Sequence, residues 1–297
     1  MYFDFEKLNL SGYVTDGDGS QDCIEIENGQ QHIRHELKSD IEEADARIIP
    51  HVAFSIRSGT KRVVVLSNDT DVVVLLLYYF NQFLSMGVQQ LWIKFGTGDN
   101  SRYIPIHTLA DKLGENNCQM VLKVHGLTGC DVTSKLGTKA AGMKADIRQL
   151  VNFGVSELVD PSSFVLAEKY LCGVLYPNES CQTFDTLRYR LYTKKNKDLS
   201  SLPPTSHVLY GHLLRSHYFV WTCHTLLTEN AATLNPQRFG WNLVDNVLIP
   251  DKHLCSLPEI YTATCRCNKK CTGRCMCKKN GTTCTEYCNC SEGGCVY

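Results

Sequence analysis

The densest run of apolar residues in the chain surrounds two acids, Asp69 and Asp71. Residues 62–66, just before the acids, form a short β-branched run that predicts a strand buried on both faces. Residues 72–84, just after them, have the length of a helix, which either aspartate or Thr70 can cap. Because an unpaired buried charge is costly, we expect the acids to emerge in the turn at the carboxyl end of the strand.

The flanking sequence alternates between helix-like and strand-like patterns. Residues 40–49 predict a helix capped by Asp40, and Pro50 is expected to kink or end it early. Residues 90–95 predict a second strand, and residues 106–114 a short helix that ends at a glycine. Strands that alternate with helices predict an α/β fold with a mostly parallel sheet.

Shifts in composition divide the chain into four parts. The first is loop-rich, the second carries the α/β pattern, the third is helical and the fourth is a small cysteine-rich module. In the third part, residues 162–176 and 204–227 predict helices, and the basic segment 193–197 predicts a loop. The four parts span residues 1–39, 40–150, 151–262 and 263–297.

The overall composition is that of an ordinary soluble protein. The 297 residues are 43% hydrophobic and 21% charged, and the formal net charge is −1, which excludes a globally basic nucleic-acid binder but not a local basic patch. The first residues lack the basic and apolar regions of a secretory signal, and the longest apolar run is too short to span a bilayer. We therefore expect a nuclear or cytoplasmic protein that is not secreted and has no membrane partner.

Acidic residues recur at the ends of the predicted elements. Asp69 and Asp71 follow a strand, Glu43 and Asp45 lie at a helix start, and Asp131 lies in a glycine-bounded turn after an apolar stretch. Each acid alone is explained by capping, by solvation or by a turn. Ligands of parallel α/β sheets bind beyond the carboxyl ends of the strands, and carboxylates bind hard divalent cations. The ordered set therefore favours a cation site.

The motifs "EAD", "NDTD" and "GCD", followed by a glycine and a lysine, resemble the PIN-like/flap-endonuclease (XPG-type) superfamily over about residues 39–150. The resemblance implies a nuclease whose acids converge on Mg²⁺ or Mn²⁺. Two such ions about 4 Å apart can activate a water and stabilise the leaving oxygen of a phosphodiester. It also implies that Gly137 and Lys139 belong to a turn that grips DNA. The implied catalytic residues are Glu43, Asp45, Asp69, Asp71 and Asp131.

Two features depart from the family pattern. Residues two apart on a helix do not share a face, so Glu43 and Asp45 can both be ligands only if the first turn is irregular or one acts through water. Glu42 and Asp45 are a sterically easier pair. The family sheet begins with a strand that carries a further aspartate, whereas residues 1–42 contain no convincing apolar strand. We therefore expect a PIN-like domain that is truncated at its N-terminus or has an incomplete acidic site.

Sixteen cysteines are present, and nine of them lie between Cys265 and Cys295. Without a secretory signal, such a cluster favours metal binding over disulfide bonds, although a disulfide knot is the alternative. Structural zinc takes four thiolates, so nine cysteines can hold three ions if three sulfurs bridge. The segment has almost no apolar residues and is expected to need metal in order to fold.

The central spacing C-x-C-x6-C-x3-C-x-C resembles the tesmin-type CXC domain. The resemblance implies three structural Zn²⁺ ions and DNA binding. The tyrosine that precedes the fourth cysteine in the family is Arg274 here, and an arginine can enter a narrow minor groove. The module carries six basic residues against two acids, which favours contact with phosphates. The implied zinc ligands are Cys265, Cys267, Cys271, Cys275, Cys277, Cys284, Cys288, Cys290 and Cys295.

The sequence as a whole predicts a metal-dependent nucleic-acid-processing protein, with DNA favoured over RNA and a zinc-binding C-terminal module. The alternative is a non-catalytic DNA- or chromatin-binding protein, or one derived from a mobile element, whose nuclease domain is degenerate. Four histidines, His207, His212, His217 and His224, share no helical face and are expected to be core or surface residues instead of metal ligands.

Overall fold

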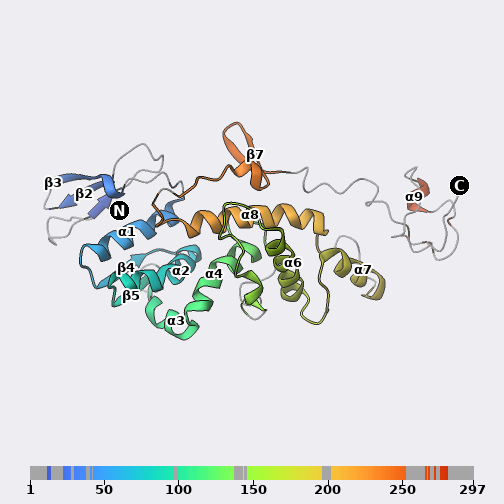
Figure 1. Cartoon of the computed structure of the whole chain (residues 1–297), viewed down its shortest axis with the longest axis horizontal. Coiled ribbons are helices and arrows are strands. Elements are labelled where there is room, and N and C mark those ends of the chain that lie inside the picture. The colour runs from blue at the N-terminus through green and yellow to red at the C-terminus, as the bar shows by residue number, and fades with distance from the viewer. Residues whose placement is uncertain are drawn as a thin grey trace.

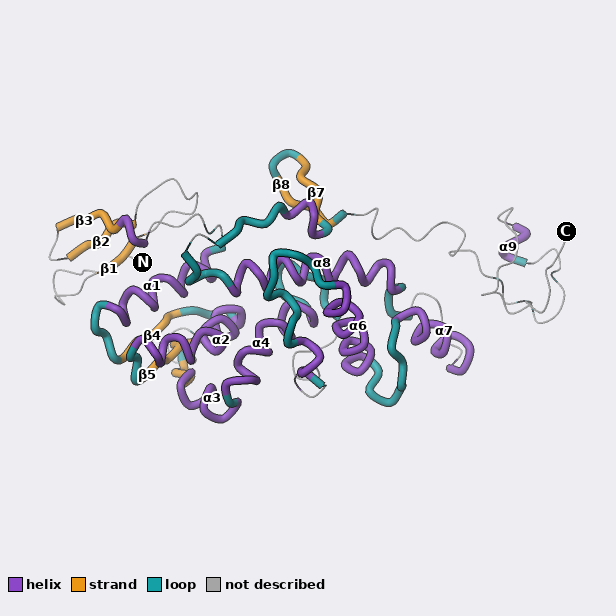
Figure 2. Tube along the Cα trace, viewed as in Figure 1, coloured by secondary structure: helices purple, strands orange, loops and turns teal. Residues whose placement is uncertain are grey.

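A computed structural model shows a mixed α/β protein, mostly helical, with small sheets and a cysteine cluster near the C-terminus (Figure 1). The connections between elements are drawn in Figure 2. None of the described helices is long and apolar enough to cross a membrane. The structure describes residues 12–14, 23–27, 30–37, 41, 43–96, 100–136, 143, 146–195, 202–229, 231–251, 265, 267, 271 and 275–279.

The sheet that carries the acidic turn has the strand order β4-β5-β6. Strands β4 (Arg62–Leu66) and β5 (Gln90–Phe95) have the bounds that the sequence predicts, and they are parallel. Strand β6 (Arg102–Pro105) was not predicted and runs antiparallel to β5. The sheet is therefore partly parallel, whereas the sequence predicted a mostly parallel one.

The two faces of this sheet differ in exposure among the described residues. Val65 of β4 and its β5 partner Ile93 are buried in the core formed with the neighbouring helices. On the opposite face Val64 is 47% exposed and Leu66 is 64% exposed. The prediction that β4 is buried on both faces is therefore wrong, because a β-branched run is compatible with one or two covered faces.

Four helices surround the sheet: α1 (Ala44–Arg57), α2 (Thr70–Met86), α3 (Ile106–Leu113) and α4 (Glu115–Thr128). Helix α2 ends at Gly87, which has the left-handed conformation that glycine favours (φ 109°). Helix α1 begins four residues later than predicted and continues through Pro50. We attribute its persistence to its buried face, which includes Ile49 and Val52 and packs against α2.

The helical part consists of α6 (Pro161–Leu175), α7 (Phe184–Lys195) and α8 (Ser206–His224), with a short 3₁₀ helix, Ile147–Leu150, before them. Helix α8 runs across α4 and α6 and contacts both (Figure 1). Residues 193–195, predicted to be part of a loop, are the last turn of α7.

Two further sheets are small and antiparallel. The first contains β1 (Gly12–Val14), β2 (Cys23–Glu27) and β3 (Gln30–Arg34), so the predicted loop-rich segment contains strands. The second is the hairpin of β7 (Trp241–Val244) and β8 (Val247–Pro250). Its two turn residues both have positive φ, as two-residue hairpin turns require. Among the described residues there are also the short helices His35–Leu37, Pro236–Phe239 and α9 (Met276–Lys279).

Candidate functional site

The turn between β4 and α2 is held in place by its own polar groups. Asp69 is the N-cap of α2, and its Oδ1 accepts a hydrogen bond of 2.8 Å from the amide of Asp71. The amide of Asp69 donates to Ser67 Oγ at 3.0 Å, and Asn68 Oδ1 accepts a 2.6 Å hydrogen bond from the amide of Gly96, just after β5. Of the three capping candidates that the sequence offered, Asp69 is the one that caps α2, and the turn is tied to the adjacent strand.

Glu43 and Asp45 lie at the start of α1, as the sequence places them. Glu43 is the N-cap, with extended backbone angles (φ −71°, ψ 120°), and its exposed side chain makes no capping hydrogen bond. Asp45 is partly buried in the first turn. Because Glu43 lies outside the helix, the rule that residues two apart on a helix face different sides does not separate this pair. The alternative ligand, Glu42, lies outside the described residues.

Asp131 lies in a turn after α4 that requires glycine at its start. Gly129 has φ 119°, and a Cβ there would lie 2.6 Å from the Cα of Lys135. Thr133 fixes the turn, since its Oγ1 accepts from the amide of Cys130 at 3.2 Å and donates to the carbonyl of Gly126 at 2.8 Å. Asp131 itself is exposed. The predicted glycine-bounded turn is therefore confirmed.

The five predicted acids share one electrostatic environment around Asp45. Partial burial raises the pKa of Asp45, and the charges of Asp69, Asp71, Glu43 and Asp131 raise it further, in that order. Carboxylates that raise the pKa of a neighbour disfavour its ionised form by repulsion. The three acidic motifs therefore converge, although they are separated by as many as 88 positions in the sequence.

The acids lie near one another, but their carboxylate oxygens do not form one set of mutually close ligand atoms. Among the described residues, only one set of three or more potential ligand side chains has all its donor atoms within 4.8 Å of one another, and that set consists of cysteines. The acids therefore do not form a closed set of ligand atoms among the described residues.

His125 belongs to the same site and was not predicted. It is 1% exposed in the last turn of α4, and its Nε2 lies 2.9 Å from Oδ1 of Asp71. The distance is that of an ion pair, but the ring N–H is not aligned for a hydrogen bond. No pattern in the sequence marks His125, because this residue has no ligand spacing to the acids and its helix was not predicted.

Two cysteines lie at the inner edge of the acidic site. Burial raises the pKa of Cys223, in α8, and the charges of Cys130, Asp71 and Glu43 raise it further. Burial also raises the pKa of Cys130. Both thiols are therefore held in the neutral form, which is neither a good nucleophile nor a metal ligand.

Three histidines of α8 are wholly or partly buried, and each makes a hydrogen bond. His212 Nε2 contacts the carbonyl oxygen of Leu127 at 3.0 Å, and His217 Nε2 contacts that of Ser156 at 2.8 Å. His224 Nδ1 is hydrogen-bonded to the hydroxyl of Tyr78. Burial lowers the pKa of all three, and that of His212 falls to about 4.

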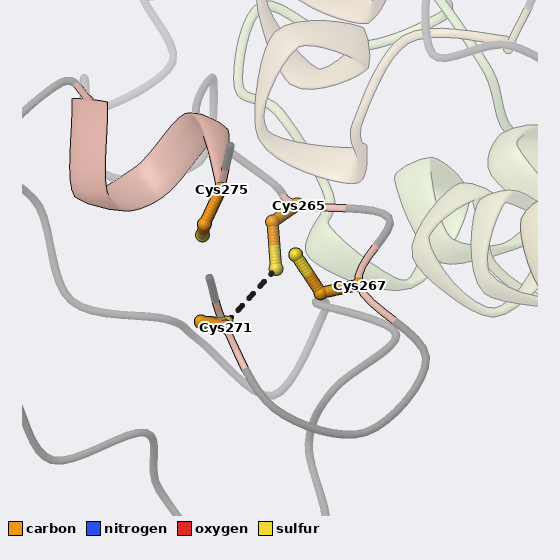
Figure 3. A group of neighbouring side chains, drawn as sticks. All are labelled: Cys265, Cys267, Cys271 and Cys275. Atoms are coloured by element: carbon orange, nitrogen blue, oxygen red, sulfur yellow. Dashed lines mark hydrogen bonds between the residues drawn. The ribbon is translucent and has the colours of Figure 1, made fainter. Parts of the chain in front are cut away.

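The second candidate centre is the cluster of Cys265, Cys267, Cys271 and Cys275 (Figure 3). The Sγ atoms of Cys265 and Cys271 are 3.7 Å apart. A tetrahedral Zn²⁺ with Zn–S bonds of about 2.3 Å places its sulfurs about 3.8 Å apart, whereas a disulfide has an S–S distance of about 2.05 Å. No disulfide joins any two of the cysteines that the structure describes. The donor set therefore fits a single metal ion such as zinc.

Only four of the predicted zinc ligands form the described cysteine cluster. Cys277 is fully buried beside this cluster but is not one of its four members. The expected three-ion arrangement and the expected DNA contacts therefore stay predictions. The predicted residues that lie outside the described part of the chain are Gly137, Lys139, Arg274, Cys284, Cys288, Cys290 and Cys295.

Comparison with known proteins does not add to this picture. No protein-family model, no curated protein and no solved structure matches the chain.

Proposed function

We propose that the chain is a divalent-cation-dependent nuclease-like protein that hydrolyses phosphodiester bonds in DNA. The observation that carries the proposal is the convergence of the three acidic motifs on Asp45, whose pKa is raised by the four other acids. A site of concentrated negative charge that is open to solvent attracts cations, and oxygen ligands select hard ones such as Mg²⁺ or Mn²⁺.

The residues take different parts in this proposal. Asp69 caps α2 and Asp71 lies in its first turn, so the hydrogen-bonded start of this helix would position both carboxylates, while Asp45 lies in the first turn of α1. Glu43 and Asp131 are exposed, so they would bind the cation from the side that meets the substrate. A bound divalent cation supplies water activation and stabilises the leaving oxygen. The carboxylates would hold it and orient its retained waters.

The C-terminal cysteines would play a structural role in the proposed protein. The four clustered thiols would hold one Zn²⁺, and the further cysteines would extend the site to the three ions that the sequence predicts. The basic residues of this module, with Arg274 at the position of the family tyrosine, would contact DNA phosphates. Lys139 would lie near phosphate in the nuclease-like domain.

One observation favours a second candidate function. The acid donor atoms do not form a set within 4.8 Å, which suits a degenerate nuclease domain in a non-catalytic DNA- or chromatin-binding protein. A protein derived from a mobile element belongs to the same alternative. In either case DNA binding would depend on the cysteine-rich module and not on divalent cations.

A nuclease assay separates the two candidates. The purified full chain would be incubated with flap, hairpin and single-stranded DNA in the presence of Mg²⁺ or Mn²⁺. We expect cation-dependent cleavage that is lost in the double variant Asp69→Ala/Asp71→Ala and retained in Asp111→Ala, which removes an exposed acid of α3. No cleavage by the unmodified chain, or equal cleavage by the double variant, would contradict the nuclease.

A gel-shift assay tests the cysteine-rich module. We expect the zinc-loaded full chain to bind DNA with an affinity that falls as salt rises, because phosphate contacts release counterions. Salt-insensitive or absent binding would leave the module with a structural or protein-binding role.

A further inference from the structure

His125 is a buried polar side chain that packing alone does not explain. Both of its ring nitrogens are buried and lack a hydrogen bond, although Nε2 lies 2.9 Å from Oδ1 of Asp71. A buried polar atom without a hydrogen bond destabilises the folded state. Unsatisfied groups of this kind are rare in native proteins and often mark a functional role.

The surroundings hold the imidazole where it is. The ring of Phe219, in α8, lies 5.9 Å from that of His125 between ring centroids. Gly126 brings α4 so close to α8 that a Cβ there would lie 2.9 Å from Cδ1 of Phe219. The carbonyl of His125 accepts a 3.1 Å hydrogen bond from the amide of Gly129, at the start of the turn that carries Asp131. The ring of His125 is thus held beside Asp71, and its backbone carbonyl is hydrogen-bonded to the turn that carries Asp131.

We propose that His125 is a positioning residue of the acidic site, which holds the carboxylate of Asp71 in the orientation that a divalent cation requires. This inference rests on the proposed function. A carboxylate is an acceptor, so Nε2 carries the proton and faces Asp71 as the donor. A small rotation of the carboxylate on cation binding would align this contact. Partners that orient metal ligands in this way typically change metal affinity by 10–100-fold when they are removed.

The test uses Mn²⁺ as the probe, with its binding to the full chain followed by electron paramagnetic resonance. The amide nitrogen of glutamine reaches the position of Nε2, whereas that of asparagine ends near Nδ1. We therefore expect His125→Gln to keep most of the Mn²⁺ affinity and His125→Asn to lose about 10–100-fold. His217→Gln is the matched control, because His217 is equally buried but contacts Ser156 and aromatic rings. It should bind Mn²⁺ as the unmodified chain does.

The possible results separate a failure of the role of His125 from a failure of the proposed function. Equal Mn²⁺ affinities of His125→Gln and His125→Asn, with both variants folded by circular dichroism, would show that His125 only fills space and would overturn the inference alone. If the unmodified chain binds no Mn²⁺ outside the cysteine cluster, the proposed function fails and the inference fails with it. Loss of affinity in the His217→Gln control would also overturn the inference, because the effect would then not be specific to His125.

Discussion

The acidic site and the cysteine cluster are built in opposite ways. The acids lie on elements whose positions are set by an apolar core that includes Ile49 of α1, Leu76 of α2 and Leu122 of α4, all fully buried. The buried residues described in the cysteine-rich module are cysteines themselves, Cys265, Cys275 and Cys277. The arrangement of the acids therefore does not need a cation for its folding, whereas the cysteine-rich module would depend on a bound metal ion for its structure.

The acidic site and the cysteine cluster also differ in what surrounds their ligand groups. Burial raises the pKa of Asp45, and the charges of the other acids raise it further, so without a cation the folded core holds carboxylates that repel one another. In the cysteine cluster the four sulfur atoms lie within 4.8 Å of one another, and the buried residues described around them are further cysteines and not large apolar side chains.

Zinc removal should have the largest effect and should be confined to the cysteine module. Structural Zn²⁺ typically contributes about 10–16 kcal/mol of binding free energy in small zinc domains, so a chelator should expose residues 263–297 to proteolysis. The melting temperature of the helical core should not change. Cys265→Ser/Cys271→Ser should reproduce the result. A melting temperature that falls together with zinc content would show that the two regions are one folding unit.

Acid should destabilise the core through its buried histidines. Burial lowers the pKa of His212 to about 4, from an ordinary value of about 6.5. Between these values the unfolded chain binds the proton and the folded chain does not, so stability is full above pH 6.5 and falls as the pH drops towards 4. The loss amounts to about 3 kcal/mol for this residue.

Urea unfolding of the unmodified chain and of His212→Gln measures this effect. The variant should show a smaller fall in the free energy of unfolding between pH 7 and pH 4. Identical pH profiles of the two proteins would contradict the lowered pKa of His212.

Replacing Gly129 should damage the turn that carries Asp131. Its positive φ and the 2.6 Å approach of a Cβ to Lys135 predict that Gly129→Ala destabilises the core by about 1–3 kcal/mol. Gly173 offers a matched control inside α6, where a Cβ meets nothing within 4 Å. Gly173→Ala should stabilise the chain by about 0.5–1 kcal/mol. Thermal unfolding of the two variants should therefore show shifts of opposite sign, and shifts of the same sign would refute this view of the turn.

Neutralising Asp45 should have the smallest effect on stability. The pKa of Asp45 is raised, so its charge costs stability as the pH rises through that pKa. Asp45→Asn should therefore stabilise the cation-free protein at neutral pH by up to about 1 kcal/mol, with no difference at low pH, where Asp45 is protonated. Asp111→Asn is the control, since Asp111 is not among the charges that raise this pKa. A destabilised Asp45→Asn would mean that the acids do not repel one another.

The sequence predicted those elements whose patterns are local. The apolar runs of β4, β5, α2, α6 and α8 each carry their own signal, and Asp69 caps α2 as expected. Helix α4 was missed because it buries polar residues whose partners are distant in the sequence. Lys123, for example, is 3% exposed and donates to the carbonyl of Leu150 at 3.1 Å. Such compensation is visible only in three dimensions.

The same reason limits what could be predicted of the site. The acids were found because short motifs mark them, whereas His125 and Cys223 reach the site through the packing of α4 and α8. Strands β1 to β3 were missed because they are short and none contains a continuous apolar run, so their pairing depends on contacts between strands.

Three distant acidic segments are proposed to form one divalent-cation site, and iron-directed cleavage tests this arrangement. The zinc-loaded full chain would be treated with Fe²⁺, ascorbate and hydrogen peroxide, which generate radicals that cut the backbone next to the bound iron. We expect cuts in all three segments, 43–45, 69–71 and 130–131, each suppressed by excess Mg²⁺. Cuts in only one of these segments, or cuts that excess Mg²⁺ does not suppress, would contradict a shared site.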